Sequence, residues 1–225
     1  VFIYSYIYGD LGGSYEITPE IQQTNLEFGR SIDIVTRYGR TFLLVGTPAT
    51  GNTDHPGGAQ LYEYNADTDT WNFLQELTAE NAEPSDQAGY SVALSWNEVR
   101  PTLLLGAPGA NQNMGQVHWF NFNPGSETPW NYARSITPAE EIADARFGTS
   151  LDLYRTQGEM MFMAGAPAAG NAEFAGQSEI YRLHDSEETW SLKGRLQNPD
   201  LEGDAQLGHA GAMVPMDGKL RFFTS

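Results

Sequence analysis

The chain has 225 residues and no cysteine, which excludes disulfides, thiolate nucleophiles and cysteine-ligated metal sites. Its 12 Lys and Arg residues stand against 29 Asp and Glu residues, giving a formal net charge of −17. A polyanion of this size repels phosphate backbones and anionic membrane surfaces, so we expect no nucleic-acid partner and no membrane insertion. Glycine (24 residues) and aromatic residues (12%) are abundant, which favours turns and strands over helices.

The sequence repeats itself with a period near 60 residues, and three independent landmarks keep that period. The first is a glycine, at Gly29, Gly89, Gly148 and Gly208. The second is a glycine two residues before a proline, at Gly46, Gly106 and Gly165. The third is a tryptophan, at Trp71, Trp130 and Trp190, with Tyr15 at the matching place upstream. Chance agreement of all three is very improbable, so the chain is built from repeated structural units.

Each unit is predicted to contain four short strands. Residues 1–27 supply only the last two strands of a unit, with a hairpin loop around Gly9. In the unit 28–87 the strands are expected at 31–35, 42–45, 61–64 and from Trp71, where residues at +2 and +6 would share its face. In the units 88–146 and 147–206 they are expected at 91–95, 103–105, 117–122 and from Trp130, and at 150–154, 160–164, 180–183 and from Trp190. Residues 207–225 supply the first two strands of a further unit.

Four antiparallel strands per unit, repeated around an axis, describe the blades of a β-propeller. We therefore predict an all-β fold: a single propeller domain over residues 1–225, with about four four-stranded antiparallel blades. The expected units are 1–27 with 207–225, 28–87, 88–146 and 147–206. Two arrangements remain open. The end segments could complete one shared blade and close a four-bladed ring, or the chain could be part of a larger ring, which we favour.

The repeat resembles the FG-GAP repeat of the integrin α-subunit head propeller, and most closely its long-period bacterial and algal variants. Phe28-Gly29 and Phe147-Gly148 stand before the first strand of their units, and Gly-Ala-Pro follows the second strand at 106–108 and 165–167. The resemblance covers essentially the whole chain. It implies a propeller that usually has seven blades and works in adhesion at the cell surface. Ala88, Leu207 and Thr47 depart from the motif.

Calcium-binding FG-GAP repeats carry a D-x-D-x-D-G-type loop between the first two strands. The corresponding loops here, at 36–40, 96–100, 155–159 and 216–219, offer too few oxygen ligands, so we expect no metal and no cofactor. Kelch repeats are a rival, because the Tyr64 to Trp71 segment has a kelch-like look. Kelch units are shorter, about 50 residues, and carry a Gly-Gly pair in each blade. Only Gly57-Gly58 fits that pattern, so FG-GAP is preferred.

No reactive constellation is visible in the sequence. The four histidines have no metal-ligand spacing, and no nucleophile elbow or phosphate-binding loop occurs. Asp33 and Asp152 share one offset from their repeat glycines, whereas the second unit has Ala93 there. A polysaccharide-active enzyme with acidic residues near the ring centre would use such carboxylates. We rank that hypothesis last.

Recognition is expected from the long polar loops after the second strand of each unit. Asn and Asp with an aromatic residue suit sugar hydroxyls or a protein partner, although the same residues also form turns. The candidate ligand-binding residues are Asn52, Asp54, His55, Asn111, Asn113, Asn171, Glu173 and Phe174. These loops and the acidic connections between units should emerge on one face of the ring.

The favoured hypothesis is thus a non-enzymatic interaction or structural module of an extracellular or cell-surface protein, within a larger assembly. It would bind a protein or glycan through one propeller face. The alternatives are lectin-like sugar binding between blades and the polysaccharide-active enzyme. The expected catalytic set is empty, and the repeat residues Phe28, Gly29, Gly89, Phe147, Gly148, Gly208, Trp71, Trp130 and Trp190 are assigned to the scaffold.

Overall fold

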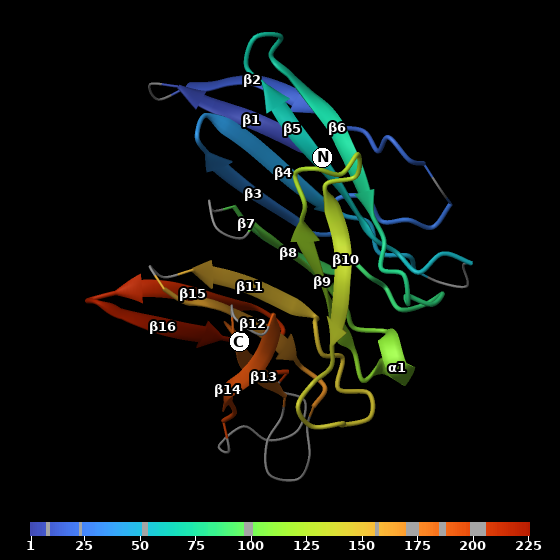
Figure 1. Ribbon diagram of the computed structural model, residues 1–225, viewed down its shortest axis with the longest axis vertical. Helices are drawn as coiled ribbons and strands as arrows, with labels where there is room; N and C mark the ends of the chain where they lie inside the picture. Colours follow the sequence, from blue (N-terminus) through green and yellow to red (C-terminus); the bar gives the residue numbers. More distant parts are fainter. Residues whose placement is uncertain are drawn as a thin grey trace.

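A computed structural model describes residues 1–7, 10–22, 24–50, 54–96, 101–155, 158–169, 176–184, 188–198 and 206–225. Three four-stranded antiparallel sheets and two two-stranded sheets occupy these ranges (Figure 1). The first and last sheets are two-stranded: β1 Phe2–Ile7 with β2 Asp10–Glu16, and β15 Gly211–Met216 with β16 Lys219–Thr224. No helix of the described residues is long and apolar enough to cross a membrane.

The three complete sheets keep chain order from one edge to the other. The first contains β3 Ile32–Arg37, β4 Arg40–Gly46, β5 Ala59–Asn65 and β6 Thr70–Leu77. The second contains β7 Ser91–Ser95, β8 Thr102–Ala107, β9 Gln116–Phe122 and β10 Trp130–Ile136, with the short helix α1 Ala110–Asn113 after β8. The third contains β11 Ser150–Arg155, β12 Met160–Ala166, β13 Gln177–His184 and β14 Thr189–Leu196. We call these sheets blades 1, 2 and 3; they confirm the predicted propeller class.

The first strand of each complete blade, and β15 of the last sheet, lies innermost. β7 packs beside β3 and β11, and β11 packs beside β15, so β3, β7, β11 and β15 surround a common axis. A serine near the start of β3, β7 and β11 ties each of these strands to the next inner strand along the chain. The hydroxyls of Ser31, Ser91 and Ser150 donate to the carbonyls of Gly89, Gly148 and Gly208, at 2.9, 2.7 and 2.9 Å.

Close backbone approach at these junctions explains both glycine landmarks. Gly89 has φ +83°, and a Cβ built on it would lie 1.8 Å from the carbonyl oxygen of Gly58. A Cβ on Gly46 would lie 2.1 Å from the carbonyl oxygen of Gly89. Only glycine tolerates such contacts, so the repeat glycines mark the places where neighbouring blades touch.

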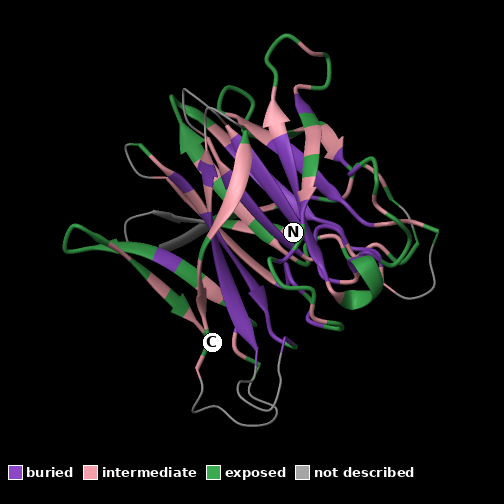
Figure 2. Cartoon of the chain, turned by 60° about the horizontal axis from the view of Figure 1, so that its bottom comes forward, coloured by how far each residue is buried: buried purple, intermediate pink, exposed green. Residues whose placement is uncertain are grey.

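Apolar side chains fill the space between blades. The strands at the centre of the molecule carry most of the buried residues (Figure 2). Trp130 of blade 2 packs in one cluster with Phe42 and Leu44 of blade 1. Trp190 of blade 3 lies edge-on to Trp119 of blade 2, with ring centroids 5.8 Å apart. The tryptophan landmarks therefore stack blades, as predicted.

The prediction that the residues at +2 and +6 share the face of the tryptophan is wrong in part, because a β-bulge interrupts the fourth strand. In blade 1 the register shifts between Leu61 and Tyr62, which places Trp71 and Phe73 on one side and Leu77 on the other. Trp71 and Phe73 pack toward β1, whereas Leu77 packs toward blade 2. The same shift recurs in blades 2 and 3. A bulge adds one residue and so reverses the alternation of side chains beyond it.

The two end sheets are half-blades that stay separate from each other (Figure 1). β1–β2 packs on blade 1 and β15–β16 packs on blade 3. Apolar side chains that face the opening between blade 1 and the β15–β16 sheet are exposed: Ile32 and Ile34 of β3 at 56% and 54%, and Phe223 of β16 at 50%. Their counterparts inside the array, such as Leu94, are buried. The ring is thus open between β15 and β3, and each end sheet has an unpaired strand edge.

The third strand of every blade carries a buried polar residue at one repeated position. It is Gln60 in blade 1, His118 in blade 2 and Glu179 in blade 3, each 0% exposed. Gln60 accepts a hydrogen bond from the Tyr62 hydroxyl at 2.6 Å, and Glu179 accepts one from Tyr181 at the same distance. In blade 2, the Nδ1 atom of His118 instead forms a hydrogen bond with the Ser135 hydroxyl at 2.9 Å. These networks fix the third strand within the blade.

The His118 position makes stability depend on pH. Burial lowers the pKa of His118 to about 4, from an ordinary value of 6.5. The unfolded chain therefore takes up the proton first, so stability is unaffected above about pH 6.5 and falls as the pH drops toward 4. We expect a loss of about 2 kcal/mol at pH 5, measured by urea denaturation at pH 7.5 and pH 5. His118→Gln, which copies blade 1, should remove that part of the loss; an unchanged pH dependence would show that His118 is not its source.

Candidate functional site

The four inner strands deliver four side chains to one cavity at the axis. Arg30, Tyr90, Thr149 and His209 each follow the repeat glycine directly, and all four line a cavity of about 340 Å³. In each of the four segments the next two residues complete the wall of the cavity. Because the repeat places one such residue at the start of every inner strand, the ring brings together positions about 60 residues apart in the sequence. The repeat glycines were recognisable from the sequence, whereas the role of the residues that follow them was not predicted.

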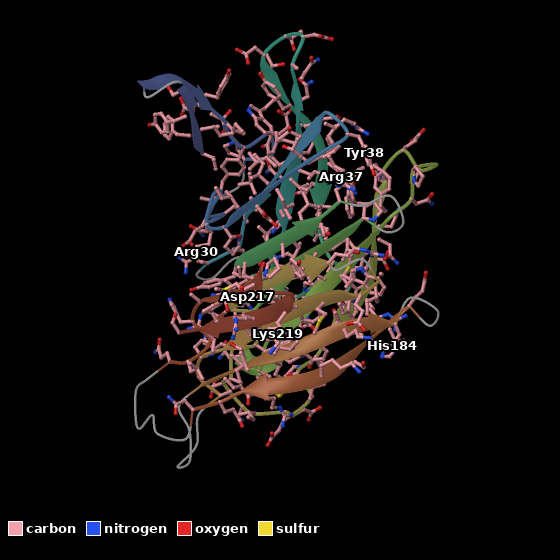
Figure 3. All side chains as sticks on the ribbon, turned by 90° about the vertical axis from the view of Figure 1, so that its left-hand side faces the viewer. Arg30, Arg37, Tyr38, His184, Asp217 and Lys219 are labelled. Carbon is pink, nitrogen blue, oxygen red and sulfur yellow. The ribbon has the colours of Figure 1, made fainter. Side chains whose placement is uncertain are left out.

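The polar groups of this axial pocket differ in what they already bind. The Arg30 guanidinium lies 4.2 Å from the centre of the Tyr90 ring and donates a hydrogen bond to the Tyr90 hydroxyl. Thr149 donates its hydroxyl proton to the carbonyl of Arg146 at 2.7 Å. His209 is exposed. Figure 3 shows Arg30 at one end of the blue β3–β4. The cavity is lined by residues from the starts of all four inner strands.

Two carboxylates lie further along the inner strands. Asp33 on β3 accepts the backbone N–H groups of Ile34 and Leu94, at 2.8 and 2.6 Å. Asp152 on β11 accepts those of Leu153, at 2.9 Å, and Met213. Each carboxylate thus bridges to the inner strand of the following blade. Burial raises the pKa of Asp33, with the two N–H bonds opposing and the charge of Asp152 adding to the rise.

The predicted loop residues lie partly within the described structure. Asn111 and Asn113 belong to the α1 segment, where Asn113 donates to Asp144 at 3.1 Å and Asn111 to Gln116 at 3.4 Å. His55 accepts the N–H of Gly57 at 3.0 Å through Nδ1, and Asp54 is exposed. The remaining four, Asn52, Asn171, Glu173 and Phe174, lie outside the described residues. Their binding role remains a prediction.

The long loops leave the sheets at the end where the axial pocket opens. Ile32 pairs with Val45, so the start of an inner strand and the end of its neighbour lie together. The loop after β4 begins at that end, and parallel bridges such as Gly57 to Ala88 join the loop to the connection between blades. The described ends of the predicted recognition loops and the residues that line the axial pocket therefore lie at the same end of the sheets.

A second cavity, of about 470 Å³, lies between β2 and β6. Tyr15, Asp69 and Trp71 contribute to its wall. Asp69 accepts hydrogen bonds from Tyr15, at 2.6 Å, and from Tyr64. The bond from Tyr64 to Asp69 is the main reason that the pKa of Tyr64 is raised to about 12. The three side chains tie the N-terminal half-blade to blade 1. Within the described ranges, no group of three or more His, Asp or Glu side chains is placed to hold a metal ion.

No protein-family model matches the chain, and no curated protein matches it. Solved structures do match. The NanB sialidase of Streptococcus pneumoniae superposes with a TM-score of 0.59 at 9% identity, over 95% of this chain and 30% of that one. A family 117 glycoside hydrolase of the marine bacterium Zobellia galactanivorans gives 0.57 at 12%, over 99% and 68%. The family 32 β-fructofuranosidase of Bombyx mori gives 0.50 at 14%, over 80% and 40%.

These comparisons correct the functional expectation. At identities of 9 to 14% the likeness establishes the fold, a β-propeller, and this chain spans less than half of two of the three proteins. The three solved propellers named above are glycoside-cleaving enzymes. The expectation of a non-enzymatic interaction module, and of no enzymatic activity, is therefore wrong. Sequence reasoning failed here because the repeat identifies a scaffold that supports many functions.

Proposed function

We propose that this chain is the propeller of a carbohydrate-active enzyme, which binds a sugar unit in the axial pocket and hydrolyses a glycosidic bond with inner-strand carboxylates. The observation that carries the proposal is the convergence of Arg30, Tyr90, Thr149 and His209 on one cavity. An aromatic ring beside hydrogen-bonding side chains suits the apolar faces and hydroxyls of a sugar. The glycoside-cleaving activity of the structurally similar propellers supports the choice of this class.

Glycoside hydrolysis needs two carboxyl groups in different protonation states. One donates a proton to the oxygen of the leaving group, and the other, ionised, activates water or attacks the sugar carbon. The inner strands β3, β7, β11 and β15 carry two acidic residues, Asp33 and Asp152. The raised pKa of Asp33 suits the proton donor, which leaves the role of base or nucleophile to Asp152. Both are half-buried and keep lone pairs beyond those that accept backbone N–H groups.

The proposal predicts that Asp33→Asn and Asp152→Asn each lower hydrolysis at least about 100-fold, since general acid–base catalysis contributes that much or more. The measurement is release of reducing sugar from a panel of polysaccharides and aryl glycosides. Asp67→Asn, at an exposed turn, is the matched control and should hydrolyse at the unchanged rate. Melting temperatures of all three variants separate lost chemistry from lost strand bridging. Full activity in both inner-strand variants would contradict their assignment, and a wild-type chain that neither binds nor cleaves any glycan would contradict the function.

The repeat type and the setting form part of the same proposal. Phe28-Gly29, Phe147-Gly148 and the two Gly-Ala-Pro segments support an FG-GAP-type repeat. The surplus of acidic residues is consistent with an extracellular or cell-surface location, where a glycan is the expected partner. A tagged full-length protein, localised by microscopy and cell fractionation, tests the setting.

A further inference from the structure

The lining of the axial pocket contains no acidic residue, although the chain is rich in acidic residues. Asp and Glu make up 29 of the 225 residues, yet the twelve residues that line the pocket include none. The same wall carries one permanent cation, Arg30, and one imidazole, His209. The lining itself therefore carries positive charge, and the two inner-strand carboxylates, Asp33 and Asp152, come directly after the lining residues Ile32 and Leu151.

The Arg30 guanidinium is held in place without being neutralised. Arg40 and Arg182, by comparison, pair with Glu63 at 2.5 Å and with Glu159 at 2.8 Å. Within the described part of the chain, no carboxylate lies at ion-pair distance from Arg30. Its partner is Tyr90, which supports the guanidinium through its ring and accepts one N–H through its hydroxyl. A guanidinium has five N–H donors, so most of its capacity remains for a ligand.

A guanidinium with free donors recognises planar or tetrahedral oxyanions in particular. Its rigid fork can donate two parallel hydrogen bonds to a carboxylate or sulfate, and such charge-assisted bonds are about twice as strong as neutral ones. The overall charge of −17 does not prevent this contact. At physiological ionic strength charges more than about 8 Å apart are largely screened, whereas a direct contact in a cavity is screened far less.

We propose that the axial pocket selects an anionic sugar, with Arg30 binding the carboxylate of a uronic acid or the sulfate of a sulfated sugar. Tyr90 orients Arg30, and His209 and Thr149 contact the rest of the sugar ring. This inference rests on the proposed function, because it names the substrate class of the same pocket. It goes beyond that function in requiring a charged group at one position of the glycan.

The test compares matched neutral and acidic ligands by isothermal titration calorimetry with the full chain. The probes are a galactose trisaccharide, the corresponding galacturonic acid trisaccharide and a 6-sulfated galactose trisaccharide. We expect at least one acidic probe to bind about 10- to 100-fold more tightly than the neutral one, the range typical of hydrogen bonds to a charged group. Which acidic probe binds better distinguishes the carboxylate from the sulfate.

Arg30→Gln should abolish the preference for the acidic probe while leaving binding of the neutral one nearly unchanged. Arg30→Lys keeps the charge but loses the fork, so it should retain only part of the preference. Arg37→Gln is the matched control. Arg37 is also exposed and packs over a tyrosine ring, at 4.9 Å from Tyr38, but Figure 3 shows it far from Arg30 along β3. Its variant should bind all three probes as the wild type does.

The outcomes separate this inference from the function on which it rests. Equal affinity for acidic and neutral probes would overturn the anionic selectivity and leave glycan binding intact. A preference that survives Arg30→Gln would place the anion elsewhere and overturn the assignment to Arg30. Failure of all three probes, with hydrolysis of some other neutral glycan, would also overturn the inference. Failure of every glycan to bind or be cleaved would overturn the proposed function as well.

Discussion

Leu94→Ala is expected to lower the free energy of unfolding by about 2 to 5 kcal/mol, whereas Ile34→Ala is expected to cost less than about 1 kcal/mol. The two residues hold the same position in successive inner strands, five residues after the repeat glycine. Leu94 is 6% exposed because blade 1 covers it, and Ile34 is 54% exposed because it faces the opening of the ring. Denaturant unfolding of both variants and the wild type measures the difference.

This pair tests the open ring directly, because residue type and repeat position are nearly constant and only the covering differs. Leu153→Ala extends the series, since Leu153 packs in the core between blades 2 and 3. A cost at Ile34 as large as that at Leu94 would mean that Ile34 is covered in solution. In that case the ring would be closed over β3 under the conditions of the measurement.

Arg195→Met is expected to destabilise the protein by about 3 to 5 kcal/mol, because it leaves a buried carboxylate without its cation. The Glu179 side chain is 0% exposed, and its Oε1 accepts the Arg195 Nε at 2.9 Å. Its Oε2 accepts the Tyr181 hydroxyl at 2.6 Å and the N–H of Ala139 at 3.1 Å. Chemical denaturation at pH 7 is the measurement.

Blade 1 supplies the control for this prediction. Gln60 holds the position of Glu179 and accepts the equivalent bonds, from Tyr62 at 2.6 Å and from the N–H of Glu20 at 3.0 Å. A neutral amide therefore fits the network without an arginine. Glu179→Gln should recover most of the loss when it is combined with Arg195→Met. If the double variant is as unstable as Arg195→Met alone, lost packing of the arginine stem, not the stranded charge, is the cause.

The sequence predicted the fold well where a local pattern and a long-range repeat agreed. The strands expected at 91–95 and from Trp130 match β7 and β10 within a residue. The bulge was not predictable from alternation, because the +2 and +6 pattern looks the same whether or not a residue is inserted. Leu77 turns to the opposite side only through the register of β6 on β5. Such register is decided by pairing with another strand, not by the strand itself.

The candidate site was less accessible to sequence reasoning. The residue after the repeat glycine differs in chemistry from unit to unit, being Arg30, Tyr90, Thr149 or His209. Comparison of the units therefore shows a variable position, whereas the structure places all four side chains at one cavity. The useful signal was positional: the residue after each repeat glycine lies at the start of an inner strand. Asp33 and Asp152 were noticed through their shared offset, but their bridges to Leu94 and Met213 depend on how blades pack. Side chains that come from separate blades can be recognised as one site only after the arrangement of the blades around the axis is known.

The unpaired edges of β1 and β16 bear on how the molecule stays dispersed. An uncovered strand edge beside exposed apolar side chains is a template for pairing with other chains, and proteins commonly protect such edges with charge. In this chain the protection is global, because a net charge of −17 makes every copy repel every other. The acidic surplus thus acts as a colloidal stabiliser for a protein whose end sheets have unpaired strand edges.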